Sequence, residues 1–154
     1  MMPSSIGKDL TLAKDVLLKN DLSLVVVKNE RILFKGKSQG IGDMLEMINA
    51  LGELTAGSSL ADSIVGRAAA LLCVYSGIVG VYASTLSEPA ASFLKANGIP
   101  YEFGTLVPKI LNRRKDDICP FDKAVFGIED PAVALERLKS LRLWNSTQGG
   151  RETR

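Results

Sequence analysis

The chain has 154 residues, of which 46% are hydrophobic and 23% are charged, and its formal net charge is +2. This length suits a single domain with a buried core, and the small net charge argues against nucleic-acid binding by phosphate neutralisation. No run approaches the ~18 apolar residues of a membrane span. The start of the chain lacks the apolar core of a signal peptide. There are two cysteines without CxxC spacing and no histidine. We therefore expect a cytoplasmic protein with no disulfide framework, no cofactor and no Ser-His or Cys-His nucleophile pair.

The first elements along the chain are predicted to be a helix and a β-hairpin. Apolar residues recur on one face of Lys8–Lys19, which is typical of an amphipathic helix. β-Branched residues fill Ser23–Val27, and strand-forming residues return at Ile32–Phe34. The polar segment Lys28–Arg31 lies between these two runs and therefore predicts a hairpin turn.

Glycines and polar residues then separate two predicted helices. The segment Ser38–Gly42 ends the hairpin and lacks a full phosphate-binding glycine pattern. A helix with an apolar face opens at Asp43, and Thr55–Ser59 is predicted to be a loop. We expect Asp62 to cap the next helix, which covers Val65–Tyr75.

The second half of the chain alternates strands with helices. Ile78–Ala83 and Ile99–Phe103 are apolar runs that predict buried strands. Between them lies a helix that Ser87 caps and that the pair Asn97-Gly98 ends. A polar surface segment follows, and then a short helix that Pro120 opens.

This order of elements predicts an α/β fold in which helices cover both faces of a mixed sheet, a three-layer α/β/α sandwich with an N-terminal β-hairpin. The last helix is expected to begin at Asp130-Pro131 and to end near Leu141. We divide the chain into an N-terminal helix (1–21), one domain (22–144) and a flexible tail (145–154).

Two segments that each open a predicted helix are similar to the signatures of a known family. They are Asp62–Leu72 (DSIVGRAAALL) and Ile118–Val125 (ICPFDKAV). In this order they resemble the paired signatures of domain-of-unknown-function family 1893, and the resemblance extends over roughly Leu22 to Leu141. It implies the cytidine deaminase-like fold. It also favours a homodimer, because domains of that kind often pair.

Zinc deaminases of this fold begin one helix with His-Ala-Glu or Cys-Ala-Glu and another with Pro-Cys-x-x-Cys. The resemblance places Gly66 and Arg67 in the first of these positions, where neither can supply a zinc ligand or the catalytic Glu. In the second it places Cys119, with Asp122 where another thiolate is expected. One thiolate and one carboxylate do not make a normal zinc site. We therefore expect no bound metal and no zinc-dependent deamination.

The resemblance implies that both helix starts face one pocket. We expect this pocket to bind a small anionic molecule or a nucleotide. Arg67 and the helix dipoles would hold the anion. Asp62 would orient Arg67 or a ligand hydroxyl, and Gly66, Asp122 and Lys123 would complete the lining. Cys119 would lie at the floor. A structural interpretation is equally open, in which Asp62 caps the helix and Gly66 permits close packing.

Two other functions stay open, and whether the chain is an enzyme is undecided. Cys119 lies at a predicted helix start, which lowers the pKa of a thiol, although a structural role is more typical of a lone cysteine. A zinc-independent enzyme would use Cys119 as nucleophile with Lys123 activating it. Alternatively, the chain is a non-catalytic oligomeric interaction module. Cys73 lies in an apolar helix and is predicted to be core. The cluster Arg113–Lys115 is more typical of a solvated surface than of a phosphate contact.

Overall fold

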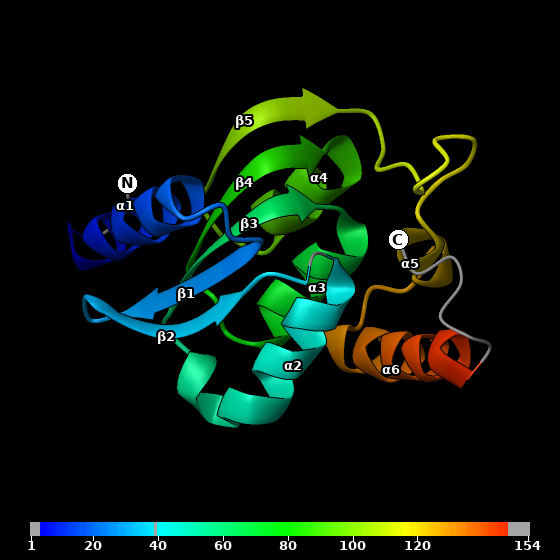
Figure 1. The fold of residues 1–154 in the computed structure, drawn as a ribbon, viewed down its shortest axis with the longest axis horizontal. Helices are drawn as coiled ribbons and strands as arrows, with labels where there is room; N and C mark the ends of the chain where they lie inside the picture. The colour runs from blue at the N-terminus through cyan, green and yellow to red at the C-terminus, as the bar shows by residue number, and fades with distance from the viewer. Residues whose placement is uncertain (1–3, 39, 148–154) are drawn as a thin grey trace.

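The computed structural model describes residues 4–38 and 40–147; residues 1–3, Gln39 and residues 148–154 lie outside the described residues. The fold is shown in Figure 1. In chain order the elements are α1 (Ser4–Lys19), β1 (Leu24–Lys28), β2 (Arg31–Gly36), α2 (Ile41–Leu51), η1 (Gly52–Thr55), β3 (Ser59–Val65), α3 (Arg67–Tyr75), β4 (Gly80–Ser87), α4 (Glu88–Ala96), β5 (Tyr101–Val107), α5 (Pro120–Ala124) and α6 (Pro131–Thr147).

The strands form one five-stranded sheet in the order β2-β1-β3-β4-β5. β1 pairs antiparallel with both β2 and β3. From β3 onward the pairing is parallel, to β4 and then to β5. The helices α3 and α4 are the crossovers that parallel neighbours require. The predicted mixed sheet with an N-terminal hairpin is therefore confirmed, and the change from antiparallel to parallel pairing falls at β3.

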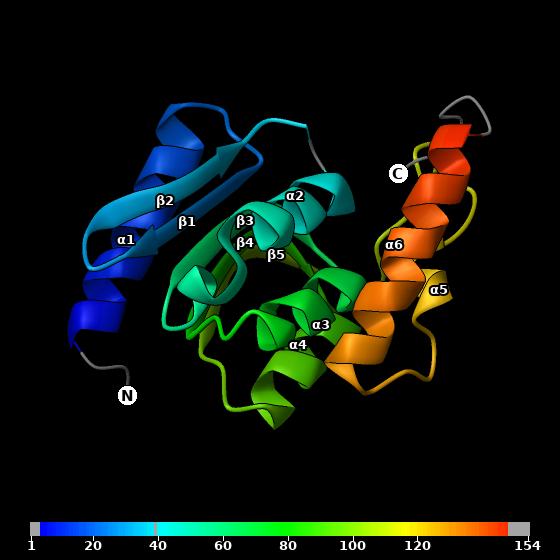
Figure 2. The ribbon, with the colours of Figure 1, turned by 90° about the horizontal axis from the view of Figure 1, so that it is seen from below.

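Helices lie on both faces of this sheet (Figures 1 and 2). On one face α1 buries apolar side chains against β1, β3 and β4; this cluster contains Leu10, Ala13, Leu17, Val25, Val27, Ala61 and Tyr82. On the other face α2, α3 and α4 share the larger core. The short side chains of Ala68–Ala70 let α3 lie close against the strands. α6 adds buried residues to this larger core and packs beside α3 and α5. The three-layer arrangement is confirmed.

The central strand β3 is the element that the sequence prediction missed. Its residues Ser59–Val65 were expected to contain the end of a loop and a helix cap, but they pair with strands on both sides. Five of the seven positions are buried, and the buried polar residues Ser59 and Asp62 disguise the strand in the sequence. Asp62 is thus a strand residue and not the helix cap. The N-cap of α3 is Gly66, and the helix begins at Arg67.

The β1–β2 turn is held by a residue from α1. Asn29 and Glu30 both have positive φ angles, 53° and 64°, as a tight hairpin turn requires. Their backbone N–H groups donate to the two carboxylate oxygens of buried Asp9, over 2.9 and 2.8 Å. This contact ties the N-terminal helix to the hairpin, so α1 forms a layer of the same fold.

The C-terminal helix is longer than the sequence indicates. α6 was expected to end near Leu141, and it continues to Thr147, into the segment predicted to be a tail. The remainder of that predicted tail, 148–154, lies outside the described residues. Within the described part of the chain, no helix is both long and apolar enough to cross a membrane.

Candidate functional site

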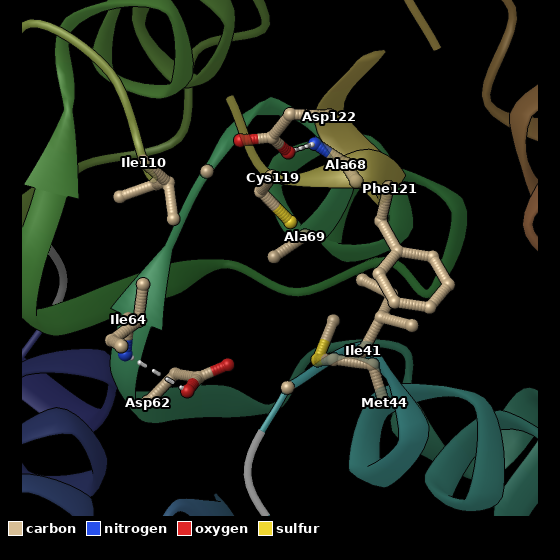
Figure 3. Close-up of a pocket in the computed structure, with 12 residues that line it drawn as sticks. Ile41, Met44, Asp62, Ile64, Ala68, Ala69, Ile110, Cys119, Phe121 and Asp122 are labelled. Atoms are coloured by element: carbon tan, nitrogen blue, oxygen red, sulfur yellow. Dashed lines mark hydrogen bonds between the residues drawn. The ribbon is translucent and has the colours of Figure 1, made fainter. Parts of the chain in front are cut away.

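A small pocket lies at the carboxyl end of β3, where the sheet changes from antiparallel to parallel pairing (Figure 3). Ligands of open α/β sheets bind preferentially outside the carboxyl ends of the strands. The cavity measures about 30 Å³, which is space for about two water molecules. The starts of α2, α3 and α5, together with β3 and the segment after β5, supply its lining: Gly40, Ile41, Met44, Asp62, Ile64, Gly66, Ala68, Ala69, Ile110, Cys119, Phe121 and Asp122.

Asp62 places a carboxyl group in this largely apolar lining. The residue is only 5% exposed, and its Oδ1 accepts the backbone N–H of Ile64 over 3.2 Å. Figure 3 shows Asp62 and Cys119 on opposite sides of the same cavity. Both residues line this one cavity, which Asp62 reaches from strand β3 and not from a helix cap.

Asp122 closes the start of α3. Its Oδ1 accepts the backbone N–H of Ala68 over 2.9 Å, and its Oδ2 would lie 2.1 Å from a Cβ atom at Gly66. The carboxylate thus caps α3 from a segment far along the chain, in the position where the helix favours a negative charge. The two sequence segments that resemble the family signatures meet here. An anion of the protein itself already occupies this helix start.

A zinc ion does not fit the residues at this site. Gly66 supplies no side-chain ligand, and the carboxylate of Asp122 is directed at the α3 backbone. Of the pocket lining, Asp62 and Cys119 then remain as possible ligands, whereas a zinc site uses three or four protein ligands. Among the residues that the structure describes, no group of three or more His, Cys, Asp or Glu side chains is arranged to hold a metal ion.

Arg67 is placed outside the pocket, unlike the sequence hypothesis. Its guanidinium donates to the carbonyl oxygen of Val125 over 2.7 Å and lies 5.3 Å from the ring centroid of Phe93. The side chain therefore joins α3 to α4 and to the end of α5. It is absent from the pocket lining, so the arrangement gives no support to Arg67 as the group that holds a ligand there.

Lys123 and the basic cluster also lie away from the pocket. The Lys123 ammonium forms an exposed ion pair with Asp117, and its hydrogen bond holds the pKa of the Asp117 carboxyl below its usual range. Arg114 lies 4.0 Å from Asp116, with both side chains exposed. The cluster Arg113–Lys115 belongs to a surface turn that Asn112 and Asp116 stabilise.

The two cysteines differ in their surroundings. Neither forms a disulfide; Cys119 is 7% exposed and lines the pocket, whereas Cys73 has no exposed surface. Burial raises the pKa of the Cys73 thiol far above its ordinary value, and the charge of Asp62 adds to this effect. Because thiolates are the reactive form, Cys73 should be inert in the folded protein.

Labelling with iodoacetamide should show this difference. We expect Cys119 to be alkylated slowly in the native protein and Cys73 only after unfolding, because only Cys119 adjoins a cavity. Peptide mass spectrometry over time measures the two rates, and Cys119→Ser is the control that should abolish native labelling. Equal native rates for the two thiols would contradict the burial described here.

The pocket lining also includes residues that the sequence did not single out. Ile110 follows β5, and Gly40 and Ile41 begin α2. In the sequence, the only feature that marked the start of α2 was the pair of glycines in Ser38–Gly42. Nothing local marks Ile110, because its place in the wall depends on how the chain returns after β5.

A family model described as Domain of unknown function (DUF1893) matches residues 12–141. The chain belongs to the DUF1893 family. The structure of a DUF1893 family protein from Thermotoga maritima is 27% identical, with a TM-score of 0.79 over 86% of this chain and 89% of that one. The family resemblance seen in the sequence is thereby confirmed.

More distant solved structures are deaminases. The dCMP deaminase from the cyanophage S-TIM5 is 17% identical, with a TM-score of 0.46 over 67% of this chain and 99% of that one. The guanine deaminase from Nitrosomonas europaea is 13% identical, with a TM-score of 0.38 over 89% and 82% of the two chains. No curated protein matches the DUF1893 chain.

Proposed function

We propose that this DUF1893 protein binds a small molecule through the pocket at the carboxyl end of β3. The observation that carries the proposal is the carboxyl group of Asp62, which is buried yet lines a cavity with mostly apolar walls. Pockets of this kind, apolar with a few placed polar groups, are typical of ligand sites. A cytoplasmic location is part of the same proposal.

The charges around the pocket indicate which part of a ligand would enter it. Asp62 and Asp122 both contribute to the lining, which contains no lysine or arginine. In a poorly solvated site two carboxylates repel an anion strongly. The group that enters should therefore donate hydrogen bonds, as an amine, an amidine or the amino group of a nucleobase does. A nucleotide remains within this class only if its phosphate stays outside the pocket.

The size of the cavity sets a second limit. At about 30 Å³ it accommodates about two heavy atoms, such as one donor nitrogen and the carbon that carries it, whereas pockets for drug-sized ligands measure about 300 Å³ or more. We infer that the ligand inserts one donor group beside Asp62. Its remaining atoms would lie outside the cavity, unless side chains in the wall change rotamer on binding.

A thermal-shift experiment tests the binding proposal. Cytidine, adenosine and methylguanidine are the donor-bearing probes, and inorganic phosphate is the anionic comparison. A probe at 100 times its Kd should stabilise the protein by about 2.7 kcal/mol. Asp62→Asn should lose that shift, because an amide neither balances a cation nor accepts at both atoms.

The matched control is Asp116→Asn, which changes an exposed carboxylate outside the pocket and should keep the full shift. Stabilisation by phosphate alone would favour the original hypothesis of an anionic ligand and contradict the donor proposal. An unchanged shift in Asp62→Asn would show that the probes bind elsewhere.

A zinc-independent enzyme with Cys119 as nucleophile is a second candidate, because the thiol lines the same pocket. The expected assistance from Lys123 lacks support, since its ammonium pairs with Asp117 on the surface. If a probe is converted, Cys119→Ser should abolish turnover while the thermal shift persists. If turnover persists in Cys119→Ser, the thiol is structural and is not the nucleophile.

A further inference from the structure

The outer edge of β5 is available for pairing. β5 is the last strand of the sheet, and within the described residues no other strand lies beyond it. The strand is exposed at every position from Glu102 to Leu106. Figure 1 shows β5 along the upper rim of the sheet, with the following loop turning away from it. An uncovered edge presents backbone N–H and C=O groups that another extended chain can satisfy.

This edge lacks the features that usually prevent association. Tyr101–Val107 contains no proline, lysine or arginine, and Phe103 and Leu106 are each 43% exposed. Its one charged residue, Glu102, lies 3.9 Å from the ammonium of Lys14. The ammonium offsets part of the negative charge that a second copy would meet at this edge.

The opposite edge of the sheet is different. β2 carries the exposed cations Arg31 and Lys35, and lysines or other charges on an edge strand oppose strand addition. Pairing of β2 with β5 of another copy would also leave a free edge at each end and so continue without limit. Pairing of β5 with β5 about a two-fold axis closes after two copies and leaves the charged β2 edges outside.

We propose that two copies of this chain associate through antiparallel pairing of their β5 strands, which joins the two sheets into one. The contact would cover Phe103 and Leu106 of both copies. It gives the homodimer expected from the sequence a specific surface. It does not depend on the pocket function, because β5 itself contributes no residue to the lining.

The mass in solution tests the proposal directly. Light scattering behind a sizing column should give twice the chain mass of 16.5 kDa at tens of micromolar protein. Leu106→Lys should weaken association about 100-fold, because the dimer contains the substitution twice and each unpaired charge costs about a factor of ten in affinity. A constant monomer mass for the wild-type chain would overturn the proposal.

The matched control is Leu54→Lys, which replaces a 64% exposed leucine in η1, away from β5. This variant should remain dimeric. Hydrogen exchange adds a readout of position: on dilution, β5 amides should lose protection while β2 amides do not change. A dimer that survives Leu106→Lys but not Leu54→Lys would place the interface elsewhere and overturn the assignment. Loss of amide protection in β2 on dilution would overturn it as well.

Discussion

Replacing Gly66 with alanine is expected to lower the free energy of unfolding by about 2–3 kcal/mol. The backbone does not cause this loss, because Gly66 has φ −100° and ψ −173°, which any residue adopts. The cause is the carboxylate of Asp122, whose Oδ2 would lie 2.1 Å from the new Cβ. Either α5 shifts, or Asp122 rotates and gives up the hydrogen bond from Ala68 that caps α3.

A double-mutant cycle measured by urea unfolding tests this explanation. Asp122→Ala should itself cost about 1 kcal/mol, the usual value of a lost N-cap. In its presence the methyl group at position 66 should cost almost nothing, so the two effects should be strongly non-additive. Gly7→Ala is the matched control, since a Cβ at Gly7 has no neighbour within 4 Å. Additive losses at positions 66 and 122 would refute the steric explanation.

The contact between Gly66 and Asp122 also explains why the two signature segments occur together. In the sequence they are two helix starts, one with Gly66 and one with Asp122. In the structure the small residue leaves space for the carboxylate, and the carboxylate caps the helix that the small residue begins. The pair therefore fixes α5 against α3 and with it the pocket wall that contains Cys119.

The elements that could be predicted from the sequence have local signals. The hairpin turn is marked by polar residues between two strand-like runs. Ser87 was expected to cap α4, and its Oγ accepts the Ala90 N–H over 3.2 Å. Gly77 and Gly98 follow helices with the positive φ angles, 72° and 71°, that favour glycine there. Each signal involves residues within a few positions of one another.

Strand β3 has no such signal. It is the central strand and lies between β1 and β4, so its surroundings depend on the whole sheet. Ser59 and Asp62 are polar but buried, which removes both the alternation of an exposed strand and the apolar run of a buried one. Which residues line the pocket depends in the same way on contacts between segments that are far apart in the sequence. The family resemblance implied one pocket for Gly66, Cys119 and Asp122, which all line the cavity. It implied the same for Arg67 and Lys123, whose contacts in the structure are with Val125 and Asp117 instead.

Arg67→Ala is expected to cost about 2–3 kcal/mol of stability, in contrast to the small loss expected if Arg67 were a ligand-binding group. A hydrogen bond to a charged donor contributes about 1.5–3 kcal/mol, and a cation over an aromatic ring adds about 0.5–1 kcal/mol. Both contacts are present, to Val125 and to Phe93. Arg67→Lys should recover only part of the loss, because lysine lacks the planar guanidinium.

The measurement is urea unfolding together with the thermal-shift screen. Arg137→Ala is the matched control, because that exposed guanidinium donates to the carbonyl oxygen of Ala124 over a longer 3.2 Å; it should cost no more than about 1 kcal/mol. The shift caused by donor-bearing probes should persist in Arg67→Ala, since Arg67 lies outside the pocket lining. Wild-type stability combined with a lost shift would instead establish Arg67 as a ligand-binding residue, because a side chain that only joins helices affects folding before it affects binding.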